Sequence, residues 1–133
     1  MKTRTLTLQT SSSKFVDLTS ELGRFVAGGH DGLLNVFVPH ATAGVAVIET
    51  GSGSEQDLEQ ALSRLLPRDQ TYVHRHGSPG HGADHVLPAF VSPSVTIPVV
   101  TGALQLGTWQ SVVLVDLNVD NPRRQVHISL MEG

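Results

Sequence analysis

The sequence predicts an α+β fold: a mainly antiparallel, sandwich-like sheet with one main helix and one or two short helices. Several short segments have the alternation or the apolar runs of strands, and Thr101-Gly102 separates two of them as in a hairpin. One segment alone repeats apolar residues at sustained helical spacing. Many short strands with few helices are typical of this class. At 133 residues, the chain is expected to be a single domain, 1–133.

Composition excludes some classes of partner. The net charge is −3 with histidine neutral, and basic residues do not cluster beyond Arg123-Arg124, so no nucleic-acid partner is expected. The first ten residues lack the apolar core of a signal peptide, and no apolar run approaches the ~20 residues of a membrane span. The absence of cysteine removes disulfides and thiolate metal ligands. We therefore expect a soluble, cytoplasmic protein without a membrane partner.

Strands and a short helix are expected in the first 50 residues. Residues 3–10 alternate polar and apolar side chains, which is typical of a half-buried strand. Thr19 is suited to cap a short helix that Gly28 and Gly29 would end. The largely apolar run 33–38 is typical of a buried strand. The expected strands are 3–10, 15–18, 33–38 and 45–49.

The main helix is expected to begin at Ser54, which together with Asp57 resembles a capping box. Leucines follow at helical spacing, at positions 58, 62, 65 and 66, until Pro67 stops the run. The elements expected downstream are an extended segment at 72–74, one or two helical turns within 85–91, a hairpin of 95–100 and 104–109, and strands at 111–119 and 125–131.

A histidine-rich stretch, residues 71–88, is the strongest functional signal. Neutral imidazole is the commonest protein ligand of transition metals, and glycines let the backbone turn several rings toward one point. A further histidine, His40, directly follows an expected strand. We predict that His40 joins part of this cluster around one metal ion, although short histidine-rich tracts are also often solvated loops. The histidines of the stretch are His74, His76, His81 and His85.

Three of these histidines, His40, His74 and His85, lie at the edges of expected regular elements, which gives their side chains defined directions. Three protein ligands and an open position are the usual plan of a catalytic zinc site. The histidine spacing fits no closed zinc finger, and cysteine is absent. The pattern therefore favours a catalytic type of metal site over a structural finger.

Several motifs resemble those of one family. HATAGVAVIE, which begins at His40, is similar to its His-Thr-(Ser/Thr)-Ala…Glu segment, and the histidine-rich stretch is similar to its Tyr-x-His…His-Leu…Pro-Val segment. GALQLGTWQSVVLVDL, followed by Arg123-Arg124, resembles its Gly-Thr-Trp-Gln segment and its closing arginine pair. By this resemblance, which covers nearly the whole chain, the protein is identified as a member of the YjbQ family, often labelled secondary thiamine-phosphate synthase.

The resemblance implies a sandwich-like α+β subunit in a homotrimer, with sites at subunit interfaces. It also implies a divalent metal, with zinc as the expected ion, held by histidines. The matching metal positions are His40, His74 and His85, whereas His76 and His81 fall where the family varies. The other matching site positions are Glu49, Trp109, Gln110, Arg124 and Asp116, the last of which replaces a glutamate.

The chain departs from the family pattern beside two of these positions. Ala41 replaces the usual threonine after the first histidine, and Ile48 and Thr50 replace asparagines that flank the acid. Ligand contacts made by those family side chains are therefore not expected here. These matching residues also have simple structural alternatives. Trp109 is also typical of core or interface packing, and Glu49 of a residue that only orients a ligand histidine. Arg123-Arg124 is also typical of a solvated pair or an intersubunit salt bridge, and Asp116 of a residue that faces water or pairs with an arginine.

The resemblance implies a metal-dependent transferase with a small phosphorylated substrate. Thiamine-phosphate synthesis joins a pyrimidine methyl pyrophosphate to a thiazole phosphate, so the metal and Arg123 or Arg124 would neutralise the leaving pyrophosphate, and Glu49 would act as base. Mg²⁺, which prefers carboxylates, is the more usual metal for diphosphates, so histidine-bound zinc equally suits a hydrolase of a phosphorylated or ester substrate. The third alternative is a non-catalytic, metal-binding trimeric protein.

Overall fold

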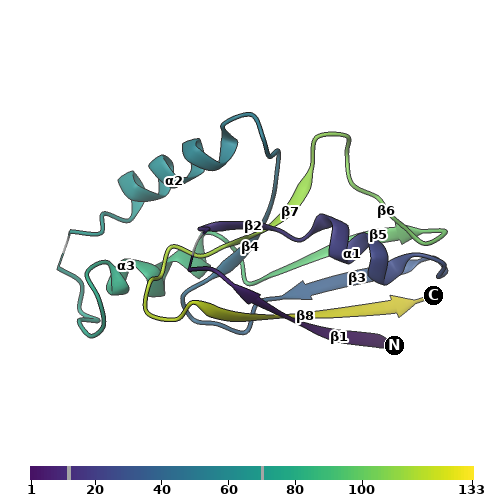
Figure 1. Cartoon of the computed structure of the whole chain (residues 1–133), viewed down its shortest axis with the longest axis horizontal. Coiled ribbons are helices and arrows are strands. Elements are labelled where there is room, and N and C mark those ends of the chain that lie inside the picture. Colours follow the sequence, from purple (N-terminus) through teal and green to yellow (C-terminus); the bar gives the residue numbers. More distant parts are fainter. Residues whose placement is uncertain (12, 70) are drawn as a thin grey trace.

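The computed structural model describes residues 1–11, 13–69 and 71–133, and it confirms the predicted α+β fold (Figure 1). None of the helices in these ranges has both the length and the apolar character needed to cross a membrane. The strands are β1 (Lys2–Gln9), β2 (Phe15–Asp17), β3 (Gly32–Phe37), β4 (Gly44–Ile48), β5 (Ser94–Val100), β6 (Ala103–Leu104), β7 (Ser111–Val115) and β8 (Arg123–Glu132). The helices are α1 (Thr19–Val26), α2 (Ser54–Leu65), α3 (His81–Val86) and the 3₁₀ turn η1 (Leu87–Ala89).

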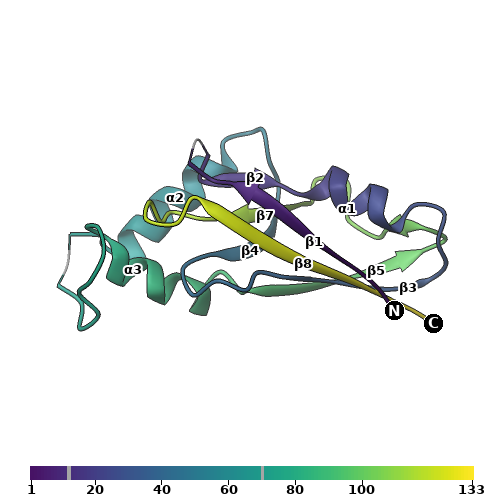
Figure 2. The same ribbon diagram turned by 60° about the horizontal axis from the view of Figure 1, so that its bottom comes forward.

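The strands pair antiparallel and build two sheets. The larger sheet has the order β1-β8-β3-β5-β6, and the smaller has the order β2-β7-β4. β8 lies between β1 and β3, so that Thr5 faces His127 on one side and Ile128 faces Val36 on the other (Figure 2). Because side chains alternate along a strand, this register sends Val36 and Ile128 to the core and His127 to the opposite face.

The two sheets pack face to face around the main core. Inward side chains of β3, β5 and β8 meet those of β4 and β7, and α1 adds Leu22, Phe25 and Val26. Each of these three helical residues is at most 1% exposed, which corresponds to a favourable burial term of about 1.5–3 kcal/mol per side chain. The apolar side chains of these strands and of α1 are thus buried where the two sheets and α1 meet.

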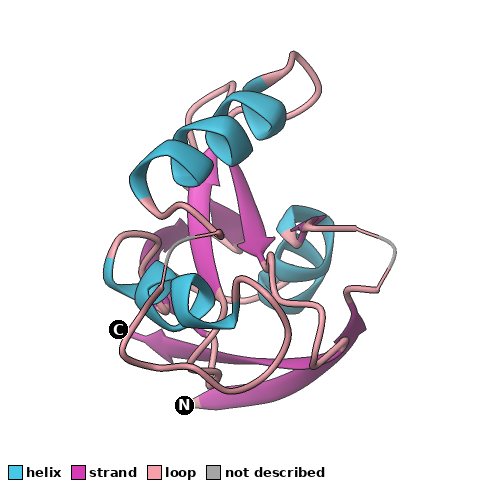
Figure 3. Ribbon diagram, turned by 90° about the vertical axis from the view of Figure 1, so that its left-hand side faces the viewer, coloured by secondary structure: helices cyan, strands magenta, loops and turns pink. Residues whose placement is uncertain are grey.

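β7 is buried on both faces, which gives the protein a third layer. Val112 and Leu114 belong to the main core, whereas Val115 belongs to a second cluster formed with the helices. Leu62 of α2 and Leu87 of η1 complete that cluster. Figure 3 shows α2 at the top of the view, on the far side of the strands from the five-stranded sheet at the bottom. The layers therefore follow the order five-stranded sheet, three-stranded sheet, and the helices α2 and α3.

The outer face of the five-stranded sheet is open in the single chain. It carries large apolar side chains that are between 41% and 61% exposed. An exposed apolar patch of this kind usually marks a surface that contacts another macromolecule. The residues are Leu33, Phe37, Val100 and Met131.

Two strands are shorter than predicted because side chains bond to nearby backbone groups. β7 ends at Val115, not at residue 119, since Asp116 Oδ1 accepts the N–H of Asn118 at 3.0 Å. β6 has only two residues, and Gln110 Oε1 accepts the N–H of Gly107 at 2.7 Å in the segment that follows. Such local bonds compete with the hydrogen-bond ladder of a strand and favour turns.

α3 begins four residues earlier than predicted, at His81. Gly80 precedes it with φ +88°, a conformation that glycine adopts at little cost. The N–H of Asp84 donates to the carbonyl oxygen of Gly80 at 3.0 Å and starts the helical hydrogen bonds. The earlier start places His81 and His85 on the same helix.

A buried ion pair joins the first turn after β7 to the start of β8. Arg124 donates from Nε to Asp116 Oδ2 at 2.7 Å and from Nη2 to Oδ1 at 3.0 Å, and both residues are 2% exposed. Thr10 Oγ1 donates to Asp116 Oδ2 at 2.8 Å, and Arg124 Nη2 donates to Thr42 Oγ1 at 2.7 Å. A buried pair of this kind tolerates the loss of one partner poorly, because the other charge stays buried.

We predict that Arg124→Leu lowers the free energy of unfolding by about 3–5 kcal/mol, because Asp116 would be left buried without its cation. The matched control is Arg24→Leu, which removes an exposed ion pair with Glu21 and should change stability by less than about 1 kcal/mol. Urea denaturation followed by circular dichroism measures both values. Equal losses in the two variants would contradict a structural role for the buried pair.

Candidate metal centre

Four imidazoles of the histidine-rich stretch converge at the end of the molecule where α3 lies (Figure 1). One ring nitrogen of each lies within 4.8 Å of the others. The ring centroid of His74 is 4.0 Å from those of His76 and His85, and the centroids of His81 and His85 are 4.6 Å apart. We call His74, His76, His81 and His85 the histidine cluster.

α3 supplies two of these rings from one face. His81 and His85 are four residues apart, which places their side chains one turn apart on the same side of a helix. Their Nε2 atoms are 2.9 Å from each other. Ala83, on the same helix, and Leu87, just after it, pack in the second core cluster, so the helix is fixed by its apolar side.

The extended segment before the glycine-rich loop supplies His74 and His76. It lies tightly against α3 because residue 82 is glycine: a Cβ there would be 2.6 Å from Tyr72 Cβ and 2.8 Å from the carbonyl oxygen of His74. Tyr72 also donates its hydroxyl to the carbonyl oxygen of Pro67 at 2.6 Å, which fixes the start of the segment. The close contact at Gly82 therefore places His74 beside the rings of α3.

Asp120 anchors the buried ring of His81. Asp120 Oδ2 lies 2.8 Å from His81 Nδ1 and accepts the backbone N–H of Ser78 at 3.1 Å, while Oδ1 accepts the Ser78 hydroxyl. The two bonds from Ser78, and then the bond from His81, lower the pKa of Asp120. An ionised carboxylate at this distance requires the proton on Nδ1 and leaves the Nε2 lone pair pointing into the cluster. Gly77, with φ +84°, permits the contact, since a Cβ there would lie 2.6 Å from the His81 ring.

Asn118 connects the histidine cluster to the buried ion pair. Its Nδ2 donates to Asp84 Oδ2 at 2.9 Å and lies 3.3 Å from His81 Nδ1, while its backbone N–H donates to Asp116. Asp84 also accepts hydrogen bonds from Arg68, which follows α2. α3 is thus held by polar contacts from two separate segments as well as by its apolar face.

The surroundings of the rings favour neutral imidazole. Burial first, and then the neighbouring His76 and His81, lower the pKa of His74. Burial first, and then the other rings of the cluster, also lower the pKa of His85, and Asp84 opposes this only in part. Neutral imidazole is the form that coordinates a metal.

The nitrogens of the cluster fit a metal ion. His74 Nε2 is buried and finds no hydrogen-bond partner among the described residues, and a buried polar atom of this kind requires an explanation such as a bound ion. His81 has a carboxylate on one nitrogen and presents the other to the cluster, as metal-bound histidines usually do. A set made of imidazoles alone suits zinc better than Mg²⁺ or Ca²⁺, which prefer oxygen ligands.

His40 lies elsewhere in the single chain. Its Nε2 accepts the backbone N–H of Gln125 at 2.9 Å. Burial, followed by the Arg124 guanidinium, lowers the pKa of His40, while Asp116 acts in the opposite direction. Within one chain, the structure therefore brings together His74 and His85 of the predicted trio, and it places His40 beside the buried ion pair.

Arg124 and Asp116, two further residues from the family motifs, are partners of each other. Their buried, hydrogen-bonded pairing is the structural alternative that the sequence allowed for Asp116. The guanidinium of Arg124 is occupied by Asp116 and Thr42, whereas the neighbouring Arg123 is exposed. Of the two arginines, Arg123 is therefore the one accessible to a ligand in this chain.

Glu49, Trp109 and Gln110 form a separate group at one end of the three-stranded sheet. Ile48 pairs with Ser111, so Glu49 and Gln110 are neighbours just beyond that pair. Trp109 is 74% exposed. In Figure 1, this end lies near the loop that precedes α2, whereas α3, which carries His81 and His85, lies at the left of the view. The structure thus separates these three residues from the cluster within one chain.

His76 and His81 fall where the family varies, yet both belong to the cluster. The signal for His81 is its His-x-x-x-His spacing with His85, which matches one face of a helix, but the helix was predicted to begin too late to include it. No local pattern indicates Asp120. Its contact with His81 joins residues 39 positions apart and depends on the fold.

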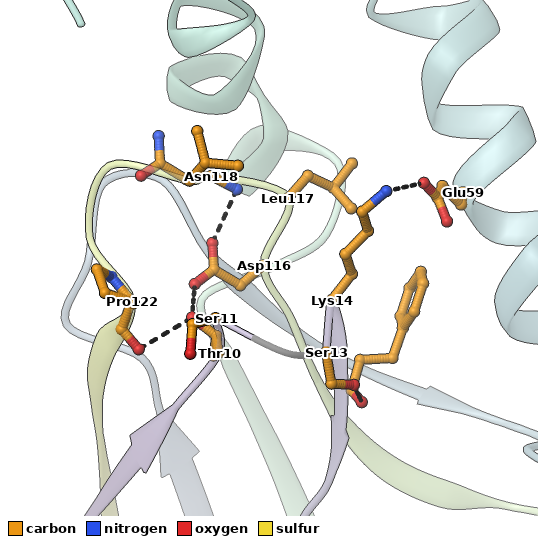
Figure 4. Close-up of a pocket in the computed structure, with 11 residues that line it drawn as sticks. Thr10, Ser11, Ser13, Lys14, Glu59, Asp116, Leu117, Asn118 and Pro122 are labelled. Atoms are coloured by element: carbon orange, nitrogen blue, oxygen red, sulfur yellow. Dashed lines mark hydrogen bonds and ion pairs between the residues drawn. The ribbon is translucent and has the colours of Figure 1, made fainter. Parts of the chain in front are cut away.

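A cavity of about 550 Å³ lies between β2, α2 and residues 116–119 (Figure 4). Its charged side chains are already paired, Lys14 with Glu59 and Asp116 with Arg124. The histidine cluster instead contains a buried ring nitrogen that lacks a partner in the described chain. We therefore take the cluster, and not this cavity, as the candidate site.

We predict that Asp120→Asn weakens zinc binding by about 10–100-fold, because an amide cannot fix the proton on His81 Nδ1 as a carboxylate does. Asp57→Asn, on the exposed side of α2, is the matched control and should leave the affinity unchanged. Competition with a chromophoric chelator measures the dissociation constants. An unchanged affinity in Asp120→Asn would show that the carboxylate does not support a metal ligand.

We predict that the metal-free protein loses stability as the pH falls below about 6.5, the ordinary pKa of histidine. The lowered pKa values of His74 and His85 mean that the unfolded chain binds protons more readily than the folded chain in this range. Melting temperatures measured between about pH 7 and pH 5 should therefore decline, and the His74→Gln, His85→Gln double variant should decline less. The same slope in both proteins would exclude these rings as the cause.

Comparisons with known proteins agree over almost the whole chain. The family model described as "UPF0047 protein YjbQ-like" matches residues 4–133. UPF0047 protein Rv2556c of Mycobacterium tuberculosis is 62% identical over 133 residues, which is 100% of both chains. A UPF0047 protein of Methanothermobacter thermautotrophicus is 33% identical over 132 residues, covering 96% of this chain and 90% of the relative.

Solved structures show the same fold. The hypothetical protein APE1520 from Aeropyrum pernix K1 is 30% identical and superposes with a TM-score of 0.87, covering 100% of both chains. The conserved hypothetical protein TT1486 from Thermus thermophilus is 32% identical, with a TM-score of 0.81, over 96% of this chain and 99% of the other. As the sequence motifs indicated, the chain belongs to the YjbQ (UPF0047) family.

Proposed function

We propose that the protein is a zinc-dependent enzyme that acts on a small phosphorylated substrate, with thiamine-phosphate synthesis as the first reaction to test. The observation that carries the proposal is the convergence of His74, His81 and His85. One ring has a buried nitrogen without a partner among the described residues, and another is oriented by the carboxylate of Asp120. This combination is typical of a metal site and unusual for solvated loop histidines.

The metal and the side chains of the protein would have separate roles in the reaction. Bound zinc would supply a Lewis acid that stabilises negative charge on a leaving pyrophosphate or on a phosphoryl group. His74, His81 and His85 would hold it, and Asp120 would keep His81 in the required tautomer. Arg123, which is exposed, is suited to a hydrogen-bonded contact with phosphate oxygens.

A homotrimer would complete the site. The open apolar face of the five-stranded sheet and the exposed Trp109 support association with other copies of the chain. Glu49, Trp109 and Gln110 lie away from the histidine cluster in one chain, so a neighbouring subunit is the proposed source of these residues at the site. The same neighbour would be required for Glu49 to act as a base, in a transferase or in a hydrolase.

A non-catalytic, metal-binding role is the second candidate function. Four imidazoles are enough to fill a tetrahedral zinc shell, and such closed shells are typical of structural sites. Native mass spectrometry before and after chelation distinguishes the two. A trimer that dissociates without metal, and that turns over no phosphorylated substrate, would favour the structural role.

We predict that zinc-loaded protein forms thiamine phosphate from the two phosphorylated precursors, and that a chelator removes this activity. His85→Ala should lower the rate at least as much as chelation, because it removes a metal ligand, while His30→Ala, an exposed histidine outside the cluster, should not. Product formation is followed by chromatography. Activity that survives both chelation and His85→Ala would exclude the metal mechanism, and hydrolysis without transfer would redirect the proposal to a phosphatase or esterase.

A further inference from the structure

His76 is held differently from the other members of the histidine cluster. His81 and His85 are carried by α3, and the backbone of His74 is packed against that helix. His76 is exposed, and its ring lies 4.0 Å from the His74 centroid and 4.7 Å from the His81 centroid. No described residue forms a hydrogen bond with the ring of His76. His76 is therefore the ring that can leave the cluster with the smallest loss of contacts.

Two members of the cluster, His74 and His76, line a surface hollow of about 420 Å³. Its charged lining residues are Arg68, Asp69 and Arg75. Arg75 is exposed and donates from Nε to the carbonyl oxygen of Tyr72 at 3.1 Å, which fixes the guanidinium at one nitrogen. The remaining N–H groups of a guanidinium in this position are suited to bind a phosphate or carboxylate. The hollow thus combines a positive group with the exposed side of the cluster.

We propose that His76 is an exchangeable metal ligand, and that an oxyanion of a phosphorylated substrate, bound by Arg75 in the hollow, takes its place. This inference rests on the proposed metal centre. Four imidazoles leave no open position on a tetrahedral ion, whereas a catalytic site requires one for the substrate. Movement of His76 toward solvent opens that position on the side of the hollow, while His74, His81 and His85 retain the metal.

The arrangement also accounts for the difference in burial within the cluster. A ring that must leave and return gains from being exposed and unanchored, whereas permanent ligands gain from packing and from a fixed tautomer. With His76 in place, a bound ion would have no position open to water. An anion with its own binding group, Arg75, can compete for the position, and a neutral molecule of the same size has no such advantage.

The test uses full-length protein loaded with cobalt(II), whose visible absorption depends on its ligands, and inorganic phosphate as the probe. Wild type, His76→Ala and Arg75→Gln are compared with the controls His30→Ala and Arg64→Gln, which alter exposed residues outside the hollow. His76→Ala should retain stoichiometric cobalt and bind phosphate about tenfold more tightly, because no protein ligand has to be displaced. Arg75→Gln should bind phosphate about tenfold more weakly with cobalt affinity unchanged, since it removes a charged hydrogen bond.

Two results would overturn the exchange. One is a phosphate response that is the same in wild type and His76→Ala; the other is loss of cobalt from His76→Ala as complete as from His85→Ala, which would make His76 a permanent ligand. Circular dichroism confirms that each variant is folded. If folded wild type binds no cobalt or zinc at all, the metal centre itself is refuted, and this outcome is distinct from a bound metal that ignores phosphate.

Discussion

The buried pair of Arg124 and Asp116 is the contact on which much of this molecule depends. It neutralises two charges between the end of β7 and the start of β8. Thr10 and the backbone N–H of Asn118 each donate a second hydrogen bond to one of the two Asp116 oxygens. Because a buried carboxylate is costly without these partners, the hydrogen bonds favour holding the segment after β7 against the start of β8. Asn118 connects this segment to α3, because its side-chain amide donates a hydrogen bond to Asp84. The position of the histidine-bearing helix is therefore linked to the core of the fold.

The histidine cluster differs from the buried ion pair, because its members do not stabilise one another by opposite charge. Four imidazoles in contact repel when protonated, and burial further disfavours the charged form. His74 and His85 respond with lowered pKa values, and a nitrogen of His74 is left buried without a partner among the described residues. The contacts that maintain this arrangement are the close approach at Gly82 and the bond between His81 and Asp120. A bound cation would give the buried nitrogen of His74 the partner that the described residues do not supply.

The family motifs map onto three places in the chain. His74 and His85 lie in the cluster, Arg124 lies in the core near His40, and Trp109 lies at the end of the small sheet. The second place is joined to the first through the polar residues 116–118. The third place, which holds Trp109, is separate from the cluster within one chain. In the trimer that we propose, a neighbouring copy would bring it to the cluster. In that proposed trimer, activity would therefore depend on assembly.

The sequence by itself determined the α+β class, the positions of most strands, the main helix over 54–65, the histidine-rich stretch and the family, because these follow from local periodicity and from motifs contiguous in the chain. The tertiary structure alone decided which rings meet. His81 entered the cluster because α3 starts after Gly80, and Asp120 became its anchor through a contact across 39 positions. His40 was placed with Arg124 because β8 offers the backbone N–H of Gln125 to its ring. Such contacts are set by the packing of distant segments, which no local spacing encodes.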